Sequence, residues 1–254
     1  MDNTGDQSAK VQSLLDQHGS IFIPNGTMRL TSPLQHGDDC YIQFESTRAA
    51  LNAAHSGAGI EGKNKLTERR FFVTIESGMI YGGGSLSYAV DMLSTTYGKL
   101  LDTRLYNSTV GWRNGGTGSQ GAYYNEARGV TISSVTTGVS NGTLGNDIKM
   151  FGGSIKDMAV GTEDNDNSSV LYDGVAIETF TAYGSRVSHS GAESAHIRLM
   201  NNRYENPSTS GLYASAIAIS IASAGQSCQV GGNYIAVVAT GVADSGSGTN
   251  VYGN

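Results

Sequence analysis

The second half of the chain reads Arg128-Gly-Val-Thr-Ile-Ser-Ser-Val, then Asn146-Asp-Ile-Lys-Met-Phe-Gly-Gly-Ser-Ile, then Tyr172-Asp-Gly-Val-Ala-Ile-Glu-Thr-Phe. Each stretch joins a short run of β-branched or apolar residues to Gly or Asn. If Ile155, Ile177 and Ile197 are equivalent positions, the pattern recurs about every 20 residues. A repeat of this kind, made mostly of strand and turn, is typical of a solenoid. We therefore expect this half of the chain to form stacked rungs of parallel strands.

The composition also favours a chain that turns often. Of the 254 residues, 35 are Gly, which is about twice the usual share, and only 15% are charged, well below the usual quarter. Only 3 residues are Pro, which argues against a disordered linker rich in Pro and Gly. The net charge of −6 argues against sequence-independent binding of nucleic acid, because phosphate contacts need clustered Lys and Arg.

The N-terminal segment contains the clearest helical pattern. Val11, Leu14 and Leu15 are spaced as one apolar stripe within residues 6–19. Gly19 suits the left-handed conformation that ends many helices. We expect Leu14 and Leu15 to be buried against the first rung.

A family resemblance follows from this beginning. The order of helix, Gly19 and Ile21-Phe-Ile-Pro-Asn-Gly-Thr, with a strand on each side of the Pro-Asn-Gly turn, resembles the start of the pectate-lyase-like superfamily. That superfamily includes bacteriophage tailspikes and related polysaccharide depolymerases. The resemblance implies an all-β fold, a right-handed parallel β-helix with a short N-terminal capping α-helix. A cap is needed because an open solenoid end exposes unpaired backbone and apolar core.

We expect one β-helix domain over residues 1–254. Its three parts are the capping helix and first strands in residues 1–34, the first rungs with insertions in 35–126, and regular rungs in 127–254. Among the insertions, residues 47–54 have helical character, and residues 85–94 favour an apolar loop or one helical turn. Residues 57–64 match two glycine-rich nucleotide patterns, but the flanking sequence lacks the helix that such sites need. We interpret that stretch as a glycine-lined turn.

The most distinctive candidate binding segment is residues 111–128, which contains the single Trp and several Gly. A long loop in a tight solenoid is often functional, and we predict that this one projects from the wall. Aromatic faces can pack on sugar rings, and amides and Arg can bind hydroxyls. The predicted glycan-binding residues are Trp112, Arg113, Tyr123, Tyr124, Asn125 and Arg128. The alternative is that Trp112 packs back on the solenoid and the two Tyr hold a loop in place.

Glu126 and Glu178 are the candidate catalytic residues. Glycoside hydrolysis needs two carboxylates about 5 to 10 Å apart, whereas elimination needs a base. Glu178 is expected to lie between Lys156 and Arg198 on neighbouring rungs, about 4.8 Å per step. Two cations would keep Glu178 ionised, which suits a nucleophile or a surface salt ladder but not a general acid. The sequence contains no decisive catalytic signature, and it leaves both reactions and simple binding open.

No metal or other cofactor is expected, although Ca²⁺ is one alternative. The stretch Glu163-Asp-Asn-Asp-Asn-Ser-Ser offers the oxygen ligands that Ca²⁺ prefers, but it lacks the full EF-hand spacing, and we interpret it as a solvated turn. Cys40 and Cys228 would be several rungs apart in a solenoid, too far for a disulfide. We expect both thiols to be reduced.

The leading hypothesis is a tailspike-like or receptor-binding protein that binds, and in one version cleaves, a bacterial surface polysaccharide. It would form a homotrimer in a phage tail, beside other tail proteins. One alternative is a free-standing secreted polysaccharide lyase or glycoside hydrolase, and another is a purely structural β-helix of a virion. The sequence has no signal-peptide pattern and no apolar run of membrane-spanning length. We therefore predict a location in the virion or outside the cell, with no membrane span.

Overall fold

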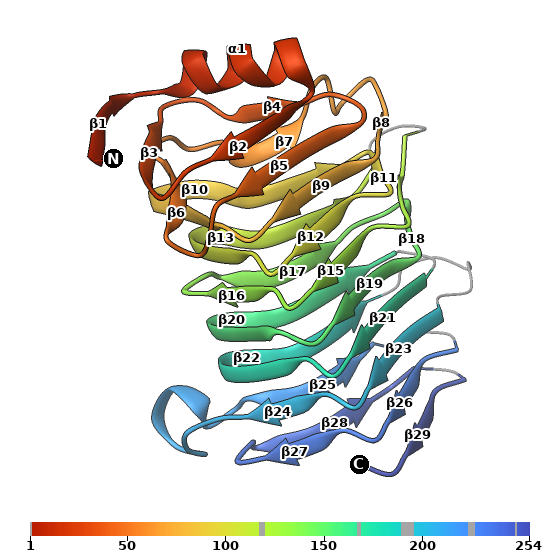
Figure 1. The fold of residues 1–254 in the computed structure, drawn as a ribbon. Coiled ribbons are helices and arrows are strands. Elements are labelled where there is room, and N and C mark those ends of the chain that lie inside the picture. Colours follow the sequence, from red (N-terminus) through yellow and green to blue (C-terminus); the bar gives the residue numbers. More distant parts are fainter. Residues whose placement is uncertain (1, 117–119, 167–168, 189–195, 223–226, 247) are drawn as a thin grey trace.

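The chain winds into a right-handed parallel β-solenoid of about 9 turns (Figure 1). The computed structural model describes residues 2–116, 120–166, 169–188, 196–222, 227–246 and 248–254. Strands pair with parallel neighbours from the adjacent turns throughout the solenoid, as in β5 with β9 and β20 with β22. The predicted fold class, including the N-terminal helix, is therefore confirmed.

One wall of the solenoid is a ten-stranded sheet in which each turn contributes one short strand. Its strands, in spatial order, are β2 (Ser20–Ile23), β5 (Cys40–Phe44), β9 (Val73–Glu76), β12 (Lys99–Leu101), β15 (Glu126–Arg128), β19 (Ile148–Phe151), β21 (Ser169–Asp173), β23 (His196–Met200), β26 (Gln229–Gly231) and β29 (Asn250–Tyr252). Inward and outward residues alternate along these strands, as the burial of alternate residues in β5 shows.

The other walls are a fifteen-stranded sheet and a four-stranded sheet. The fifteen strands are β1 (Asp2–Asp6), β3 (Gly26–Leu30), β4 (Leu34–His36), β6 (Ala49–Ala53), β7 (Ala58–Gly62), β10 (Met79–Leu93), β13 (Arg104–Gly115), β16 (Thr131–Ser133), β17 (Thr137–Asn141), β20 (Ser154–Asn165), β22 (Ala176–Ser188), β24 (Arg203–Glu205), β25 (Ile217–Ile221), β27 (Tyr234–Ala236) and β28 (Thr240–Asp244). The four are β8 (Arg70–Phe71), β11 (Thr95–Thr96), β14 (Ala122–Tyr123) and β18 (Gly145–Asn146). The long strands contain a residue with positive φ, such as Asn107, Asp157 or Thr179.

A column of glycines makes one of the tight corners possible. In Gly111, Gly138, Gly161 and Gly184, an added Cβ would lie 2.3–2.7 Å from a backbone carbonyl oxygen of the next turn. Real Cβ atoms essentially never approach that closely, so only Gly fits where these backbones meet. This column recurs from turn to turn and is a more reliable repeat marker than the isoleucines.

The isoleucine repeat is correct for one step and wrong for the next. Ile155 pairs with Ile177 across β20 and β22, as expected. Ile177 then pairs with Tyr204, whereas Ile197 lies in the ten-stranded sheet and pairs with Val170. The spacing of the isoleucines does not identify equivalent positions, because the turns of the solenoid contain different numbers of residues.

The helix α1 (Ser8–His18) covers the first turn and ends at Gly19, which is left-handed with φ 66°. Val11 and Leu15 are buried, whereas Leu14 is 43% exposed, so the prediction for Leu14 is wrong. Residues four apart share one helix face, and Leu14 lies at its margin. Within the described ranges, no helix is long and apolar enough to cross a membrane.

A side-chain amide joins α1 to the first strands. Gln12 Nε2 donates to the Gln35 carbonyl at 2.8 Å, and Gln12 Oε1 accepts the Gln35 N–H at 2.7 Å. These two bonds satisfy part of the free edge of β4, which is the role expected of a cap.

Three local predictions are wrong. Residues 47–54 contain β6 rather than a helix, and residues 85–94 belong mainly to the long strand β10. Residues 57–64 contain β7, in which a Cβ on Gly59 would meet the Ala89 carbonyl at 2.7 Å. In each case pairing with neighbouring turns overrides the local preference, because β propensity depends on tertiary context.

Both cysteines are free and buried, in agreement with the prediction that they are reduced. Burial raises the pKa of the Cys40 thiol to about 12 and that of Cys228 to about 11. Neither thiol is therefore ionised at neutral pH, and both serve as small apolar core residues.

Acid should weaken the N-terminal turns through His36. Its ring is 1% exposed, and burial lowers its pKa from 6.5 to about 4. The unfolded chain therefore takes up this proton first as the pH falls, so stability is complete above pH 6.5 and declines between 6.5 and 4. The loss is about 3 kcal/mol. Urea unfolding at several pH values in that range gives the free energy of unfolding as a function of pH. This pH dependence should be weaker in His36→Asn than in the parent chain, and an unchanged pH dependence would contradict this account.

Candidate functional site

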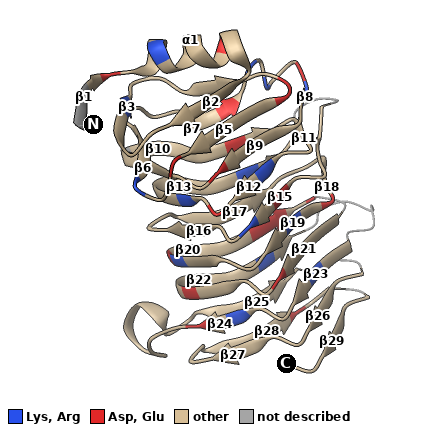
Figure 2. Ribbon diagram, viewed as in Figure 1, with Lys and Arg blue, Asp and Glu red and all other residues tan. Residues whose placement is uncertain are grey.

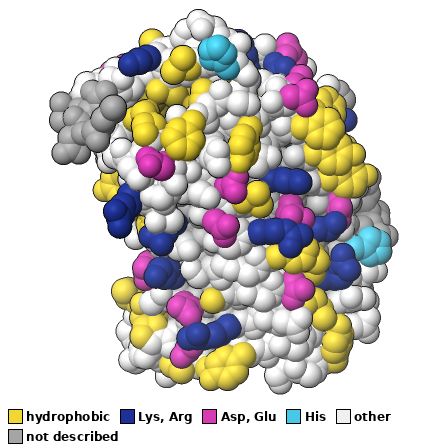
Figure 3. Space-filling model, viewed as in Figure 1, with side chains coloured by type: hydrophobic (Ala, Val, Ile, Leu, Met, Phe, Trp, Pro, Cys, Tyr) yellow, Lys and Arg dark blue, Asp and Glu magenta, His cyan; other side chains and the backbone are white. Residues whose placement is uncertain are grey.

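The outward residues of the ten-stranded sheet align into a continuous row, here called the polar row. Parallel pairing places equivalent residues about 4.8 Å apart on successive strands. From the fourth strand onward, the row consists of Lys99, Glu126, Lys149, Leu171, Arg198, Gln229 and Asn250. Figure 2 marks charged residues of both signs in the middle of this face, and Figure 3 shows their side chains at the surface.

The middle of the polar row alternates in charge from Lys99 to Glu126 to Lys149. Lys149 Nζ lies 2.8 Å from Asp147 Oδ2, and Arg128 forms an ion pair with Glu126. These pairs lie at the surface, where ion pairs contribute little to stability. Their side chains are therefore free to exchange partners with a polar ligand.

An exposed aromatic stack borders the polar row where the four-stranded sheet turns into it. The ring centroids of Phe72 and Tyr97 are 5.0 Å apart, those of Tyr97 and Tyr124 are 5.1 Å apart, and both pairs are nearly parallel. All three residues are left-handed, with φ between 56° and 59°. Figure 3 shows hydrophobic side chains gathered at this edge, near β8 and β11.

The stack limits what these rings can bind. Tyr97 has a ring on both faces, so it presents only its edge to solvent. One face of the Tyr124 ring packs on Tyr97. The other face is directed along the solenoid toward the next turn, which contains Asp147 and whose Asn146 carbonyl accepts the Tyr124 N–H. Tyr124 is therefore the member of the stack best placed to pack on a ligand ring beside the polar row.

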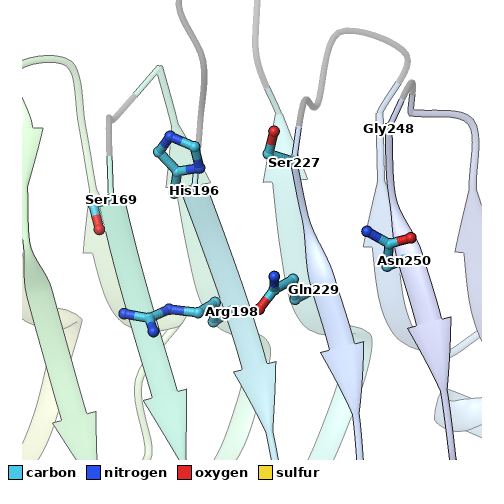
Figure 4. A pocket seen from close by; sticks show the side chains of 7 residues that line it. All are labelled: Ser169, His196, Arg198, Ser227, Gln229, Gly248 and Asn250. Carbon is cyan, nitrogen blue, oxygen red and sulfur yellow. The ribbon is translucent and has the colours of Figure 1, made fainter.

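The polar row ends in a pocket of about 560 Å³ near the C-terminal strands, here called the end pocket. Figure 4 shows His196 and Arg198 on one strand, Ser227 and Gln229 on the next, and Asn250 beyond them. The described lining residues are Ser169, His196, Arg198, Ser227, Gln229, Gly248 and Asn250. Almost all of them offer a hydroxyl, amide, imidazole or guanidinium group.

Part of the predicted binding segment does come together on this face. Tyr124 lies at its edge, and Glu126 and Arg128 point outward from β15. The Arg128 guanidinium lies 4.5 Å from the centroid of Phe151 on the next strand. Tyr123 is turned away from the row, with Arg69 4.7 Å from its ring centroid.

Trp112 is not at the surface. The predicted projecting loop of residues 111–128 is wrong, because β13 runs to Gly115, and β14 and β15 follow. The indole is 0% exposed and lies in the core between the paired residues Val90 and Val139. Its position corresponds to the alternative in which Trp112 packs back on the solenoid.

Asn125 is also internal. It is 0% exposed, its Oδ1 accepts the Gly98 N–H at 2.7 Å, and its Nδ2 donates to Asn114 Oδ1 at 3.0 Å. Asn114 in turn donates to Asn141 at 3.0 Å. An Asn that satisfies a buried backbone group across a turn is a structural element rather than a ligand-binding group.

Arg113 lies on another wall, in β13, and its guanidinium is already bound to other side chains of the protein. Its guanidinium donates to Asp91 Oδ1 at 2.9 Å and to the Tyr88 hydroxyl at 2.8 Å. Lys65 contacts the same carboxylate, which is fully buried. The two cations hold the pKa of Asp91 below its usual value despite burial, so the cluster acts as an internal clamp.

Glu178 has one of its two predicted neighbours. Lys156 pairs with it, but Arg198 lies in the ten-stranded sheet, and Glu205 occupies the next position instead. Arg203 Nη2 lies 3.1 Å from Glu178 Oε1 and 2.5 Å from Glu205 Oε2. Glu178 and Glu126 belong to different sheets, so the two candidate catalytic residues do not form one pair.

The acidic stretch begins in the last three residues of β20, Glu163 to Asn165, and its residues 167–168 lie outside the described part of the chain. Asp164 points into the core, where its Oδ1 accepts the Asn141 side-chain amide at 2.7 Å. Glu163 points outward and contacts Arg186 at 3.4 Å. Over the described residues, no group of three His, Cys, Asp or Glu side chains converges as a metal site would require.

Sequence reasoning missed Tyr97, Lys99, Lys149 and the end pocket. A signal for the first three does exist, because Tyr97, Tyr124 and Asp147 each stand two residues before an outward residue of the polar row. Aligning the chain on that spacing would have found the row. The end pocket has no such signal, because it depends on which four strands, β21, β23, β26 and β29, become neighbours.

The fold was compared with known proteins. No family model matches the chain, and no curated protein matches it in sequence. The structure is similar to ORF18 of Geobacillus virus E2, with a TM-score of 0.70 and 13% identity over 92% of this chain and 50% of that one.

Two further solved structures contain bound saccharide. A mutant of the tailspike protein of E. coli bacteriophage HK620, in complex with a hexasaccharide, has a TM-score of 0.66 and 13% identity, over 91% of this chain and 47% of that one. An iota-carrageenase complexed with iota-carrageenan fragments has a TM-score of 0.53 and 10% identity, over 90% of this chain and 53% of that one.

These likenesses show that the chain shares the right-handed parallel β-helix fold of these phage proteins and of the carrageenase. The chain spans about half the length of the solved structures it matches. At such low identity the likeness concerns the fold alone, so function must be argued from the surface.

Proposed function

We propose that the protein is a tailspike-like, polysaccharide-binding protein whose glycan lies along the polar row. The observation that carries this proposal is the polar row itself, a line of side chains that are polar except for Leu171 and that leads into the end pocket. A polymer of repeated sugar units needs repeated polar contacts along one direction. A solenoid wall supplies them at a constant spacing of about 4.8 Å.

The side chains of the row suit sugar hydroxyls. Lys149, Glu126, Gln229 and Asn250 provide donors and acceptors in alternation, while Tyr124 offers an aromatic face at the border. The fold likeness supports the same conclusion, because the HK620 tailspike mutant was solved with a hexasaccharide.

Glycan cleavage is a second candidate function, favoured by one pair of carboxylates. Glu178 and Glu205 are paired residues on β22 and β24, and they line a cavity of about 230 Å³ together with Arg203. Two carboxylates on adjacent strands fall near the separation that retaining glycosidases use, about 5 Å. Glu126, with Arg128 beside it, would then serve binding rather than catalysis.

We further propose that the protein acts in a phage tail as a receptor-binding homotrimer in contact with other tail proteins. The support is the similarity of its fold to proteins of phage origin. Closed cyclic assembly is the usual outcome for identical subunits. Light scattering should then give about three times the chain mass of 26.5 kDa, whereas a monomer would favour the free-standing enzyme.

A panel of purified capsular polysaccharides and lipopolysaccharides tests the proposed function. At least one glycan should bind in a titration of immobilised protein, with an affinity in the micromolar range or tighter, about −8 kcal/mol. Product sizing after long incubation, with Glu178→Gln as the control, separates binding from cleavage. Failure of every glycan in a broad panel would contradict the proposal.

A further inference from the structure

We propose that the end pocket binds an anionic substituent of the glycan, a carboxylate, sulfate or phosphate group held by Arg198. This inference deepens the proposed function and rests on it. It concerns the kind of glycan recognised, since a neutral polysaccharide would have no group to match this pocket.

Arg198 differs from the other two cations of the polar row, Lys99 and Lys149. Both of those lie next to Glu126 in the register, and Lys149 also contacts Asp147. Across the described part of the chain, no side-chain hydrogen bond or ion pair is made by Arg198, although it is half-buried. Its neighbours in the row, Leu171 and Gln229, are uncharged.

The polar groups that line the pocket with Arg198 can all donate hydrogen bonds. His196 lies two residues before it on β23, and Gln229 and Asn250 follow on the next two strands. Figure 4 shows these side chains on the same face, with the Arg198 guanidinium extended toward the strand of Ser169 and the Gln229 amide on the other side of the Arg198 backbone. Of the seven described lining residues, none is Asp or Glu.

Asp173, an outward carboxylate of the neighbouring strand β21, is not paired with Arg198. Asp173 belongs to the other outward row of β21, where its Oδ1 accepts the Asn201 side-chain amide at 2.9 Å. A half-buried guanidinium whose described pocket neighbours are amides, hydroxyls and an imidazole, with no acid among them, is suited to binding an anion.

A single guanidinium matches a singly charged group best. Its planar fork can donate two parallel N–H bonds to one carboxylate or sulfate group, and such charge-assisted bonds are about twice as strong as neutral ones. A neutral sugar hydroxyl in the same place would leave the cation without a counter-charge. The pocket therefore discriminates between acidic and neutral sugars of similar shape.

Nuclear magnetic resonance with small sugars tests the assignment. The probes are methyl glucuronide, glucose 6-sulfate and glucose 6-phosphate, and methyl glucoside is the neutral control. At least one anionic probe should shift the Arg198 Nε–H and the Gln229 and Asn250 side-chain amide signals, at concentrations about tenfold lower than methyl glucoside requires. The three anions separate carboxylate, sulfate and phosphate recognition.

Two variants make the test specific. Arg198→Gln should abolish the shifts at Gln229 and Asn250, whereas Arg104→Gln, which removes the same charge from β13 in the fifteen-stranded sheet, should leave them intact. Arg198→Lys keeps the charge but not the fork, and should weaken binding only in part. The inference is overturned if no anion causes shifts, if methyl glucoside acts equally well, or if Arg198→Gln changes nothing.

The outcome is separable from that of the polysaccharide panel. If a panel glycan binds and the anionic probes do not, the inference is wrong and the proposed function stands. If the probes bind at Arg198 and no polysaccharide does, the anion site is real and the proposed function is wrong.

Discussion

Trp112→Ala should lower the free energy of unfolding by about 3–5 kcal/mol, the usual cost of truncating a large buried aromatic residue. The indole is fully buried between the turns that contain Val90 and Val139, and no part of it reaches solvent. Its removal leaves a cavity that the stacked backbones on either side cannot close. Chemical denaturation of the purified variant measures the loss directly.

Two matched variants separate core packing from ligand binding. Trp112→Phe should cost clearly less, because within the described structure the indole N–H has no hydrogen-bond partner to lose. Tyr124→Ala removes an exposed ring and should change stability by less than about 1 kcal/mol. A Trp112→Ala protein of normal stability that binds glycan poorly would place the indole at the surface and refute the fold at this position.

Leu15→Ala should cost about 2–5 kcal/mol and expose the first turn of the solenoid. The Leu15 side chain is 3% exposed. Together with Val11 it forms the buried face of α1, which covers the apolar end of the core. Loss of the cap frees the strand edges of β2 and β4, so aggregation should accompany the loss of stability. Thermal unfolding and light scattering on the same sample measure both effects.

The neighbouring residue is the control for this prediction. Leu14→Ala makes the same chemical change one position earlier, but Leu14 is 43% exposed. Its effect should be below about 1 kcal/mol. Equal effects at Leu14 and Leu15 would mean that the helix does not dock through the face seen here.

The fold class could be predicted because its signals are local. The helix ending at Gly19, the turn at Gly26 and the short apolar runs all depend on neighbours in sequence. The strand registers could not be predicted from the sequence, because the turns of the solenoid contain different numbers of residues. Ile197 was therefore aligned with Ile177, although it lies in a different sheet.

The candidate site was predicted only in part for the same reason. Tyr124, Glu126 and Arg128 share a short segment and do meet on one face. Trp112 and Asn125 have residue types common in glycan sites, yet in this solenoid one fills the core and the other satisfies a buried backbone group. Residue type alone could not separate these roles, because the direction of a side chain depends on strand register.

Binding of a panel glycan to two charge-matched double variants tests most directly whether the polar row holds the glycan. Lys149→Ser with Arg198→Ser removes two positive charges from the row, and Arg104→Ser with Lys156→Ser removes two from the fifteen-stranded sheet. The polar-row variant should bind at least about tenfold more weakly than the parent chain, and the other should stay within about twofold. Equal losses in both variants, or a loss confined to Arg104 and Lys156, would contradict the assignment of the glycan to this face.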